Sequence, residues 1–231
     1  SLTDLTRKHG ALMLWDASHA VGAIEMDFDK NGVDIAVGCT YKYGNSGPGS
    51  PAWLYVNKKI QAELQVPIQG WFSQGDQFAM GPNFEKAEGI RGFQIASPSL
   101  IGLRCIKTAF SMIEEAGIAA ISEKAAIGTE MMIQLYDAWL ADLGFTLLTS
   151  RDPQERGGHI SLGHPDAARI CVALREFADV IPDYRTPNSI RLAIAPLPTS
   201  YVEVWDGFAR IRDLVSSRQY EKIEKTDSRV T

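Results

Sequence analysis

The sequence predicts an α/β protein, with a mostly parallel sheet in its first part and a smaller α/β domain after it. Two observations support this class. Continuous apolar runs at residues 11–15, 34–37 and 52–56 are typical of strands in a sheet that is covered on both faces. Two long segments with helical periodicity follow, at residues 99–116 and 118–143. Together these patterns indicate a sheet with helices packed against it.

We expect the first part to span residues 1–116. It opens with a short polar helix that ends near Gly10. Residues 69–98 are rich in Gly, Gln and Asn and predict a long loop, and a connection of this length inside a domain is usually functional. The helix of residues 99–116 follows a Ser-Pro pair, which suits a helix start.

We expect residues 117–231 to form a bridging helix, which ends before Gly144, and a small C-terminal domain. This domain alternates short apolar runs with amphipathic segments and ends in a polar stretch, residues 219–231, that is expected to fray. The predicted strands are residues 145–148, 159–162 and 190–193, and the predicted helices are residues 167–177 and 202–215.

Composition limits the function classes. The chain has 231 residues, 45% of them hydrophobic, which is enough for a sizeable core, and its formal net charge is −5. It has no long run of like charge, no apolar stretch of membrane-spanning length and no signal-peptide core, so neither a nucleic-acid nor a membrane partner is expected. The three cysteines, Cys39, Cys105 and Cys171, are too far apart in sequence for a metal-ligand motif, and we expect no metal and a cytoplasmic location.

Two residues at predicted strand ends carry the chemical signal. Asp16 follows the first apolar run, and Lys42 follows the second, where the backbone enters a Gly- and Pro-rich loop. Ligands of such sheets bind outside the strand ends. A lysine held there can form a Schiff base with an aldehyde if its surroundings lower its pKa. The plainer alternatives are a helix-capping aspartate and a solvated loop lysine.

The segments LWDASHAVGAIEMDF and GVDIAVGCTYKYGNSGPG resemble the class V aminotransferase group of fold-type I pyridoxal-phosphate enzymes. Within that group the finer pattern is similar to the kynureninases. The residues that carry this finer match are Asp16-x-x-His19-Ala20-Val21-Gly22, Thr40-Tyr41-Lys42-Tyr43, Gly70-Trp71-Phe72, Gly89-Ile90-x-Gly92-Phe93, Ser97-Pro98 and Pro187-Asn188-x-Ile190-Arg191.

The resemblance implies pyridoxal 5'-phosphate as the cofactor and assigns roles to four residues near the strand ends. Asp16 would pair with the pyridine nitrogen, so that the ring absorbs carbanion charge. Lys42 would hold the cofactor aldehyde and then move the substrate α-proton. His19 would lie close to the ring and phosphate, and Tyr41 would hydrogen-bond the phosphate, although a packed strand aromatic is a fair competing interpretation of Tyr41.

Three further residues gain roles from the resemblance. Trp71 and Ser97 would approach the phosphate from the neighbouring subunit of a dimer or other homo-oligomer. Arg191 would clamp the α-carboxylate of a small amino-acid substrate, because a planar guanidinium suits a bidentate carboxylate. A surface arginine beside a strand is the alternative for Arg191.

The implied reaction is hydrolytic Cβ–Cγ cleavage of an amino acid with a γ-ketone, such as kynurenine to anthranilate and alanine in tryptophan catabolism. One departure puts aryl-ketone specificity in doubt: kynureninases usually continue Gly-Trp-Phe/Trp with Gly-His, whereas this chain has Ser73-Gln74. Another class V activity, namely an aminotransferase, a desulfurase or another lyase, is therefore an alternative.

The resemblance covers nearly all of this chain but only the latter part of the family. The family's phosphate-binding loop and ring-stacking aromatic precede the segment that matches Asp16. We therefore expect a fragment, or one subunit of a split enzyme whose partner chain supplies the N-terminal half. Alone, such a chain is expected to bind cofactor poorly and to expose sheet edges and apolar surface.

Overall fold

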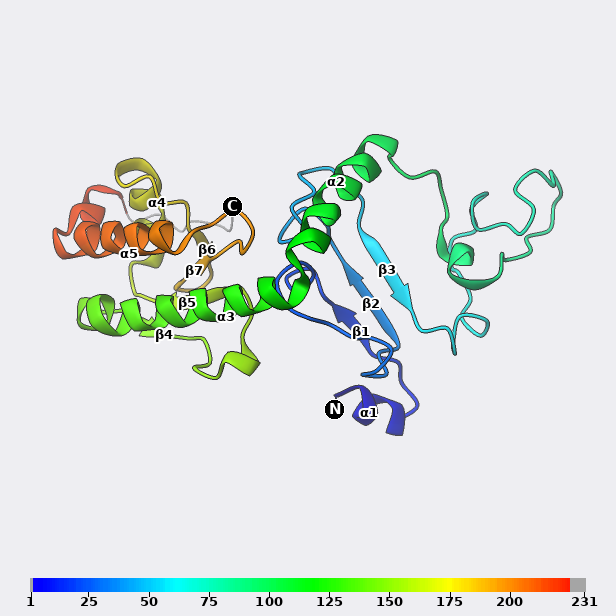
Figure 1. The fold of residues 1–231 in the computed structure, drawn as a ribbon, viewed down its shortest axis with the longest axis horizontal. Coiled ribbons are helices and arrows are strands. Elements are labelled where there is room, and N and C mark those ends of the chain that lie inside the picture. Colours follow the sequence, from blue (N-terminus) through cyan, green and yellow to red (C-terminus); the bar gives the residue numbers. More distant parts are fainter. Residues whose placement is uncertain (1, 225–231) are drawn as a thin grey trace. The chain divides into compact units, whose positions relative to one another are not determined.

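The computed structural model describes residues 2–224, and the chain divides between Glu115 and Ala116 into two compact units (Figure 1). The first unit begins with helix α1, Leu2–Lys8, and contains a three-stranded sheet. The second unit begins with a long helix and contains a four-stranded sheet.

The sheet of the first unit has the strand order β1-β2-β3, with β1 at Leu14–Asp16, β2 at Ile35–Gly38 and β3 at Trp53–Val56. The expected parallel pairing occurs between β1 and β2, whereas β3 runs antiparallel to β2. The reason is the connection: the chain between β2 and β3 contains no helix, and a parallel return needs a crossover of a dozen or more residues, usually helical. "Mostly parallel" is therefore corrected to one parallel and one antiparallel pair for this part of the sheet.

Much of this sheet is open to solvent in the described chain. Leu14 is 57% exposed and Leu54 is 39% exposed, and β1 is an edge strand. The expected coverage of both faces is thus absent within residues 2–224, while the expected exposure of a sheet edge and apolar side chains is confirmed. Buried Asp34 fixes the entry to β2, because its carboxylate accepts hydrogen bonds from the Arg7 guanidinium.

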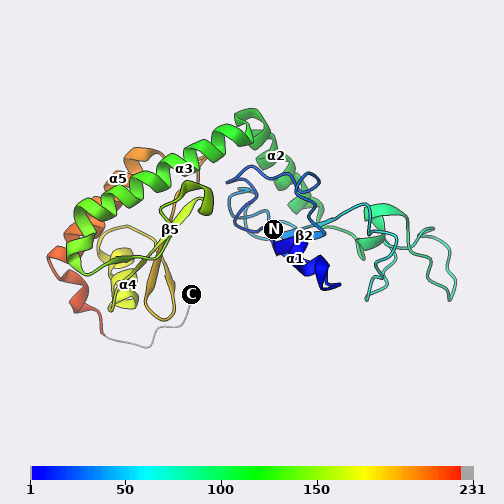
Figure 2. The same cartoon turned by 90° about the horizontal axis from the view of Figure 1, so that it is seen from below.

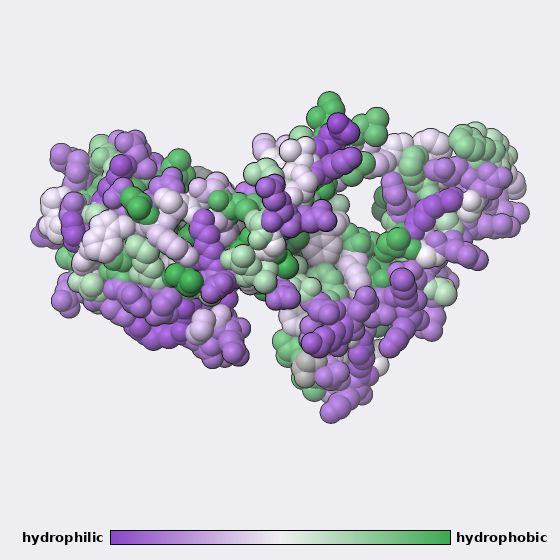
Figure 3. All heavy atoms as spheres, in the orientation of Figure 1, coloured by the Kyte–Doolittle hydropathy of each residue, from purple (hydrophilic) through white to green (hydrophobic). Residues whose placement is uncertain are grey.

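A long loop separates β3 from the next helix and includes the predicted loop of residues 69–98. We call this segment the excursion. Its regular elements are a 3-10 turn at Gly89–Phe93 and an isolated antiparallel bridge between Gln74 and Lys86. The Lys86 ammonium donates to the carbonyls of Gln61 (2.7 Å) and Leu64 (2.6 Å) and so anchors the excursion to the chain that follows β3. Helix α2, Leu100–Ala116, follows, and apolar side chains in its first turn are exposed, visible as green spheres near the top of Figure 3.

The second unit is a four-stranded antiparallel sheet with the order β4-β5-β7-β6. The strands are β4 at Thr146–Leu147, β5 at His159–Gly163, β6 at Asp183–Arg185 and β7 at Ser189–Ala193. Burial alternates along β5 and β7, so one face of the sheet is apolar and the other is polar. Strand β6 was not predicted, because its sequence, Asp183–Arg185, contains no apolar run.

Three helices bury the apolar face: α3 at Ile118–Leu135, α4 at Ala167–Phe177 and α5 at Tyr201–Ser216 (Figure 2). Helix α3 continues through a π-helical turn, Tyr136–Leu140, and a 3-10 turn, Ala141–Leu143, and ends at Gly144 with φ of 86°, as predicted. A 3-10 turn, Gln219–Lys222, follows α5, and the rest of the predicted frayed tail, residues 225–231, lies outside the described residues.

Another 3-10 turn, Pro153–Glu155, lies between β4 and β5. Within the described residues, none of the helices has the length and apolar character that a membrane crossing needs.

Candidate functional site

Asp16 lies at the carboxyl end of β1, directly beside the end of β2. The parallel register pairs Asp16 with Val37, and the ladder extends one step further, because the Ala17 N–H donates to the Val37 carbonyl at 2.8 Å. Since parallel strands end at the same edge of a sheet, the residues after β1 and those after β2 emerge side by side. This register brings the Asp16 and Lys42 segments to one edge.

The Asp16 carboxylate is held by the turn that follows it. The Ser18 N–H donates to Asp16 Oδ1 at 2.8 Å. Hydrogen bonding from Ser18 lowers the pKa of Asp16, and the positive charges of Lys42 and His19 lower it further, while partial desolvation opposes them. Asp16 is therefore an ionised carboxylate at neutral pH, and both Lys42 and His19 lie within electrostatic reach of it.

Lys42 lies in a tight turn after β2, and hydrogen bonds of Thr40 hold this turn in place. The buried Thr40 hydroxyl donates to the Pro51 carbonyl at 2.8 Å, and the Ser46 N–H donates to the Thr40 carbonyl at 3.1 Å. The Asn45 N–H donates to the Lys42 carbonyl at 2.9 Å. The half-buried Lys42 places its ammonium 5.7 Å from the centroid of the exposed Tyr41 ring.

The loop after Asp16 packs against the same turn. The rings of His19 and Tyr43 meet edge to face, with centroids 6.5 Å apart. Gly22 has φ of 78°, and a Cβ there would overlap the Tyr43 carbonyl and lie 2.9 Å from the Gly44 nitrogen. Only glycine permits this close backbone approach. The loop that carries His19 therefore packs directly against the turn that carries Lys42.

Trp71 and Ser97 lie at opposite ends of the excursion, and the structure brings these ends together. A Cβ on Gly70 would overlap the Ile95 carbonyl group, 2.6 Å from its carbon, which means that the two backbones touch. Trp71 is 52% exposed and packs edge to face on Phe72. Among the described residues, no hydrogen bond or ion pair joins Trp71 or Ser97 to Asp16 or Lys42 of the same chain.

The Gln74 side chain hydrogen-bonds the backbone within this excursion. Its side-chain Oε1 accepts a hydrogen bond from the Glu85 N–H at 2.9 Å, and the Gly75 N–H donates to the Glu85 carbonyl at 2.8 Å. The Arg91 guanidinium closes the same turn by donating to the carbonyls of Gln74 and Gly75, both at 2.7 Å. Gln74, which replaces the expected histidine, thus stabilises the conformation of this loop.

Arg191 lies on the polar face of the second unit's sheet. In the register of the sheet it is flanked by Ser161 of β5 and Asp183 of β6, and cross-strand neighbours share a face. Its guanidinium forms an ion pair with Asp183, whose Oδ2 also accepts from Arg185 Nε at 2.9 Å. Two arginines thus share one carboxylate, and the net charge of this trio is positive.

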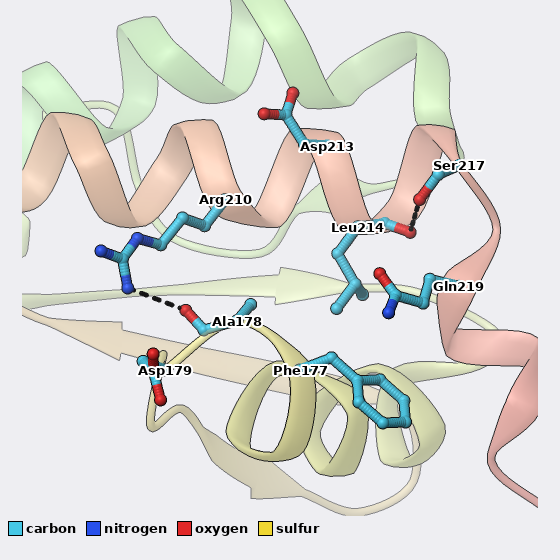
Figure 4. A pocket seen from close by; sticks show the side chains of 8 residues that line it. All are labelled: Phe177, Ala178, Asp179, Arg210, Asp213, Leu214, Ser217 and Gln219. Carbon is cyan, nitrogen blue, oxygen red and sulfur yellow. Dashed lines mark hydrogen bonds between the residues drawn. The ribbon is translucent and has the colours of Figure 1, made fainter.

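A surface hollow of the first unit is lined by Asn45, Ser46 and Gly47 of the Lys42 turn together with residues of α2. Figure 4 shows one in the second unit of about 530 Å³, lined by residues from the C-terminal parts of α4 and α5. The Arg210 guanidinium crosses one end of it and donates to the Ala178 carbonyl at 3.0 Å. Within residues 2–224, no group of three His, Cys, Asp or Glu side chains is arranged to hold a metal ion.

The sequence analysis did not single out three residues that contact the predicted site residues: Ser18, which contacts Asp16, and Asp183 and Arg185, which lie beside Arg191. The Asp-x-Ser pattern after the first strand is a signal that was available, since serine two residues on can hydrogen-bond an aspartate. The Asp183-x-Arg185 pattern was not informative by itself, because its meaning depends on pairing with Arg191 across two strands.

Comparisons with known proteins give the relationship. Residues 121–211 match the family described as the kynureninase C-terminal domain. The chain is 40% identical over 223 residues to kynureninase from Geobacillus thermodenitrificans, covering 96% of this chain and 52% of that protein. It is 33% identical over 224 residues to kynureninase from Pseudomonas fluorescens, covering 97% of this chain and 54% of that protein. This chain is similar in sequence to the kynureninases.

The relationship to kynureninases extends over nearly the whole chain, which spans about half the length of the curated relatives it matches. The structure is also similar to a cysteine desulfurase from Thermococcus onnurineus, with a TM-score of 0.74 and 18% identity over 94% of this chain and 55% of that one. This likeness gives the fold, which is fold-type I, as expected from the sequence.

Proposed function

We propose that the protein containing this chain is a pyridoxal-phosphate-dependent hydrolase that cleaves the Cβ–Cγ bond of kynurenine-like amino acids, with kynurenine giving anthranilate and alanine. The observation that carries the proposal is the placement of an ionised carboxylate, Asp16, and an amine, Lys42, after neighbouring parallel strands of this fold, within electrostatic reach of one another. The 33–40% identity to kynureninases over 96–97% of the chain supports the reaction class.

The residues present fit the cofactor. A carboxylate with a lowered pKa beside a strand end suits a protonated ring nitrogen, because it accepts a hydrogen bond and carries the opposite charge. A half-buried primary amine lies within its electrostatic reach, as an aldehyde partner requires. The hydroxyl of the exposed Tyr41 beside Lys42 is a donor suited to the phosphate.

Pyridoxal phosphate, when bound, supplies a sink for the negative charge that develops at the substrate α-carbon. Asp16 would hold the ring nitrogen in its protonated form, and His19 would help to hold the cofactor. Lys42 would anchor the cofactor, take the substrate α-proton on its amine and return a proton during turnover. Arg191 binds the α-carboxylate of the substrate through its planar guanidinium. Water completes the hydrolysis at the γ-carbonyl.

The remaining cofactor contacts are proposed to come from elsewhere in the assembly. Trp71 and Ser97 would contact the cofactor phosphate held by a neighbouring subunit of a dimer, and the exposure of both side chains in the single chain supports this role. The half of the relatives' length that this chain does not span supplies the phosphate-binding loop and the ring-stacking aromatic, on the same polypeptide or on a separate one. We place the reaction in tryptophan catabolism in the cytoplasm.

Cofactor attachment is tested first, by borohydride reduction of the protein with pyridoxal phosphate and peptide mapping. The pyridoxyl group is expected on the peptide that contains Lys42, and Lys42→Ala is expected to abolish it. Lys107→Ala, which removes an exposed lysine of α2, is the matched control and should leave labelling unchanged. Labelling that persists in Lys42→Ala at wild-type yield would contradict the assignment.

The reaction is tested by incubation with kynurenine while anthranilate fluorescence is recorded. One observation favours a second candidate, another class V reaction of the aminotransferase, desulfurase or lyase type: Gln74 replaces the expected histidine and is bound to the Glu85 backbone. Turnover of another amino donor without anthranilate release would favour that candidate. Native mass spectrometry of the purified complex tests for a separate chain, because a second polypeptide would co-purify with the 25.4 kDa chain.

A further inference from the structure

The edge of the second unit's sheet carries three charged side chains on one face. Asp183 and Arg185 are two positions apart on β6, and Asp183 pairs in register with Arg191 of β7. Side chains two residues apart on a strand share a face, and so do those of cross-strand partners. Ile190 and Leu192, the neighbours of Arg191 on β7, are buried in the core. The three charged side chains, which we call the Asp183 trio, therefore lie on the opposite, polar face.

Asp183 Oδ2 is the common acceptor of the Asp183 trio. Arg185 donates to it from Nε at 2.9 Å and pairs with it through Nη2 at 2.7 Å, and Arg191 Nη2 forms an ion pair with the same oxygen. The Tyr184 hydroxyl closes the turn between the two strands by donating to the Pro187 carbonyl at 2.7 Å. Both arginines are thus held against one carboxylate by the pairing of β6 with β7.

Charge decides what this trio can bind. One arginine and one aspartate would cancel, so a further carboxylate would gain little from them. The second arginine leaves a surplus positive charge, and the side chains stay partly in solvent, with exposed fractions of 22% for Arg191, 28% for Asp183 and 44% for Arg185. Arg175 brings another positive charge to this edge, because it donates to the Pro182 carbonyl at 3.0 Å. A cluster of this charge favours a carboxylate over a neutral group of the same shape.

We propose that Arg185 is a specificity-determining residue that acts through Asp183 and gives the trio the net positive charge with which Arg191 binds the α-carboxylate of an amino acid. This inference rests on the proposed function, because it takes from there the role of Arg191. Asp183 orients the Arg191 guanidinium, and Arg185 offsets the negative charge that this orientation introduces. The trio therefore discriminates between a carboxylate and an amide, which share a shape and differ in charge.

The test uses the full chain without cofactor, with L-alanine as the probe and L-alaninamide, which carries an amide in place of the carboxylate, as its counterpart. Binding is followed by ¹⁵N NMR of the arginine Nε groups, with the Arg191 signal assigned from Arg191→Lys. L-alanine is expected to shift this signal, and L-alaninamide is not. Arg185→Gln should raise the Kd for L-alanine about fivefold, the effect of one charge beside a partly exposed site, and Arg185→Lys should keep most of the affinity.

The matched control is Arg212→Gln, which removes the same charge outside the trio, from a guanidinium 4.7 Å from the centroid of the Trp139 ring. It should leave the Kd unchanged. If Arg185→Gln does not fold, Arg185→Met, which keeps an unbranched stem without the charge, should give the same rise. Equal Kd values in the wild type and the uncharged variant would overturn the inference. A wild-type Arg191 signal that L-alanine does not shift, or that L-alaninamide shifts equally, would overturn it too.

The two proposals fail separately. Binding of L-alanine that depends on Arg185, in a protein that releases no anthranilate from kynurenine, would refute the proposed reaction alone. Release of anthranilate by a protein whose Arg185→Gln variant binds L-alanine as tightly as the wild type would refute the role of Arg185 alone.

Discussion

Gly22→Ala tests whether the close backbone approach between the Asp16 loop and the Lys42 turn holds the site together. Gly22 is buried and has φ of 78°. A methyl group there would overlap the Tyr43 carbonyl oxygen and lie 2.6 Å from the Tyr43 carbonyl carbon, where real Cβ contacts essentially never fall below 3.0 Å. The obstacle is backbone, which cannot rotate away as a side chain does, so the turn after Lys42 must move.

The expected cost has two parts. The left-handed backbone conformation costs a non-glycine residue about 1–2 kcal/mol. Forcing the two backbones apart costs about 1–3 kcal/mol more, as overpacking does in a well-packed interior. The free energy of unfolding should therefore fall by about 2–5 kcal/mol, a large share of the stability of about 5–15 kcal/mol that is typical of a domain.

The assay is urea unfolding followed by circular dichroism, with Gly47→Ala as the matched control. Gly47 has nearly the same φ, 77°, but a Cβ there would have no atom within 4 Å, so this variant incurs only the backbone part, about 1–2 kcal/mol. Pyridoxal labelling of Lys42 should fall in Gly22→Ala and persist in Gly47→Ala. Equal losses of stability in the two variants would refute the steric argument.

Three further outcomes follow from the second unit and the cysteines. Asp183→Asn should raise the KM for substrate about tenfold with little change in kcat, because Arg191 loses the carboxylate that orients it; steady-state kinetics of the full protein with an unchanged KM would contradict this role. Burial lowers the pKa of His164, so the unfolded chain binds more protons near its ordinary pKa of 6.5. The contribution of neutral His164 to the free energy of unfolding is therefore fully present above about pH 6.5 and decreases as the pH falls below this value. In urea unfolding, the midpoint concentration of the wild type should fall with pH in this range, and His164→Gln should show a smaller fall. Burial also raises the pKa of the Cys171 thiol to about 12, so iodoacetamide at neutral pH should label exposed Cys105 and spare Cys171 in the folded protein, as peptide mapping would reveal.

Much of the secondary structure follows from the sequence, because the signals that set it are local. Helix α2 begins after a Ser-Pro pair, and the helical stretch that begins with α3 ends at Gly144, whose φ of 86° suits glycine. Helix α5 begins at a capping box in which Ser200 and Glu203 bond each other's backbone. Strand β6 lacks such a signal: three residues gain their conformation only by pairing with β7.

The sequence by itself determined that a carboxylate and a lysine follow two neighbouring strands of an α/β sheet, since apolar runs and chain order are enough for that. Only the tertiary structure decided how these residues are held. The bond from Cys39 to Ser18, the contact of Gly22 with Tyr43 and the sharing of Asp183 by two arginines all join residues that different elements bring together. The physical reason is that local patterns encode backbone conformation, whereas register and the meeting of loops depend on packing over the whole unit.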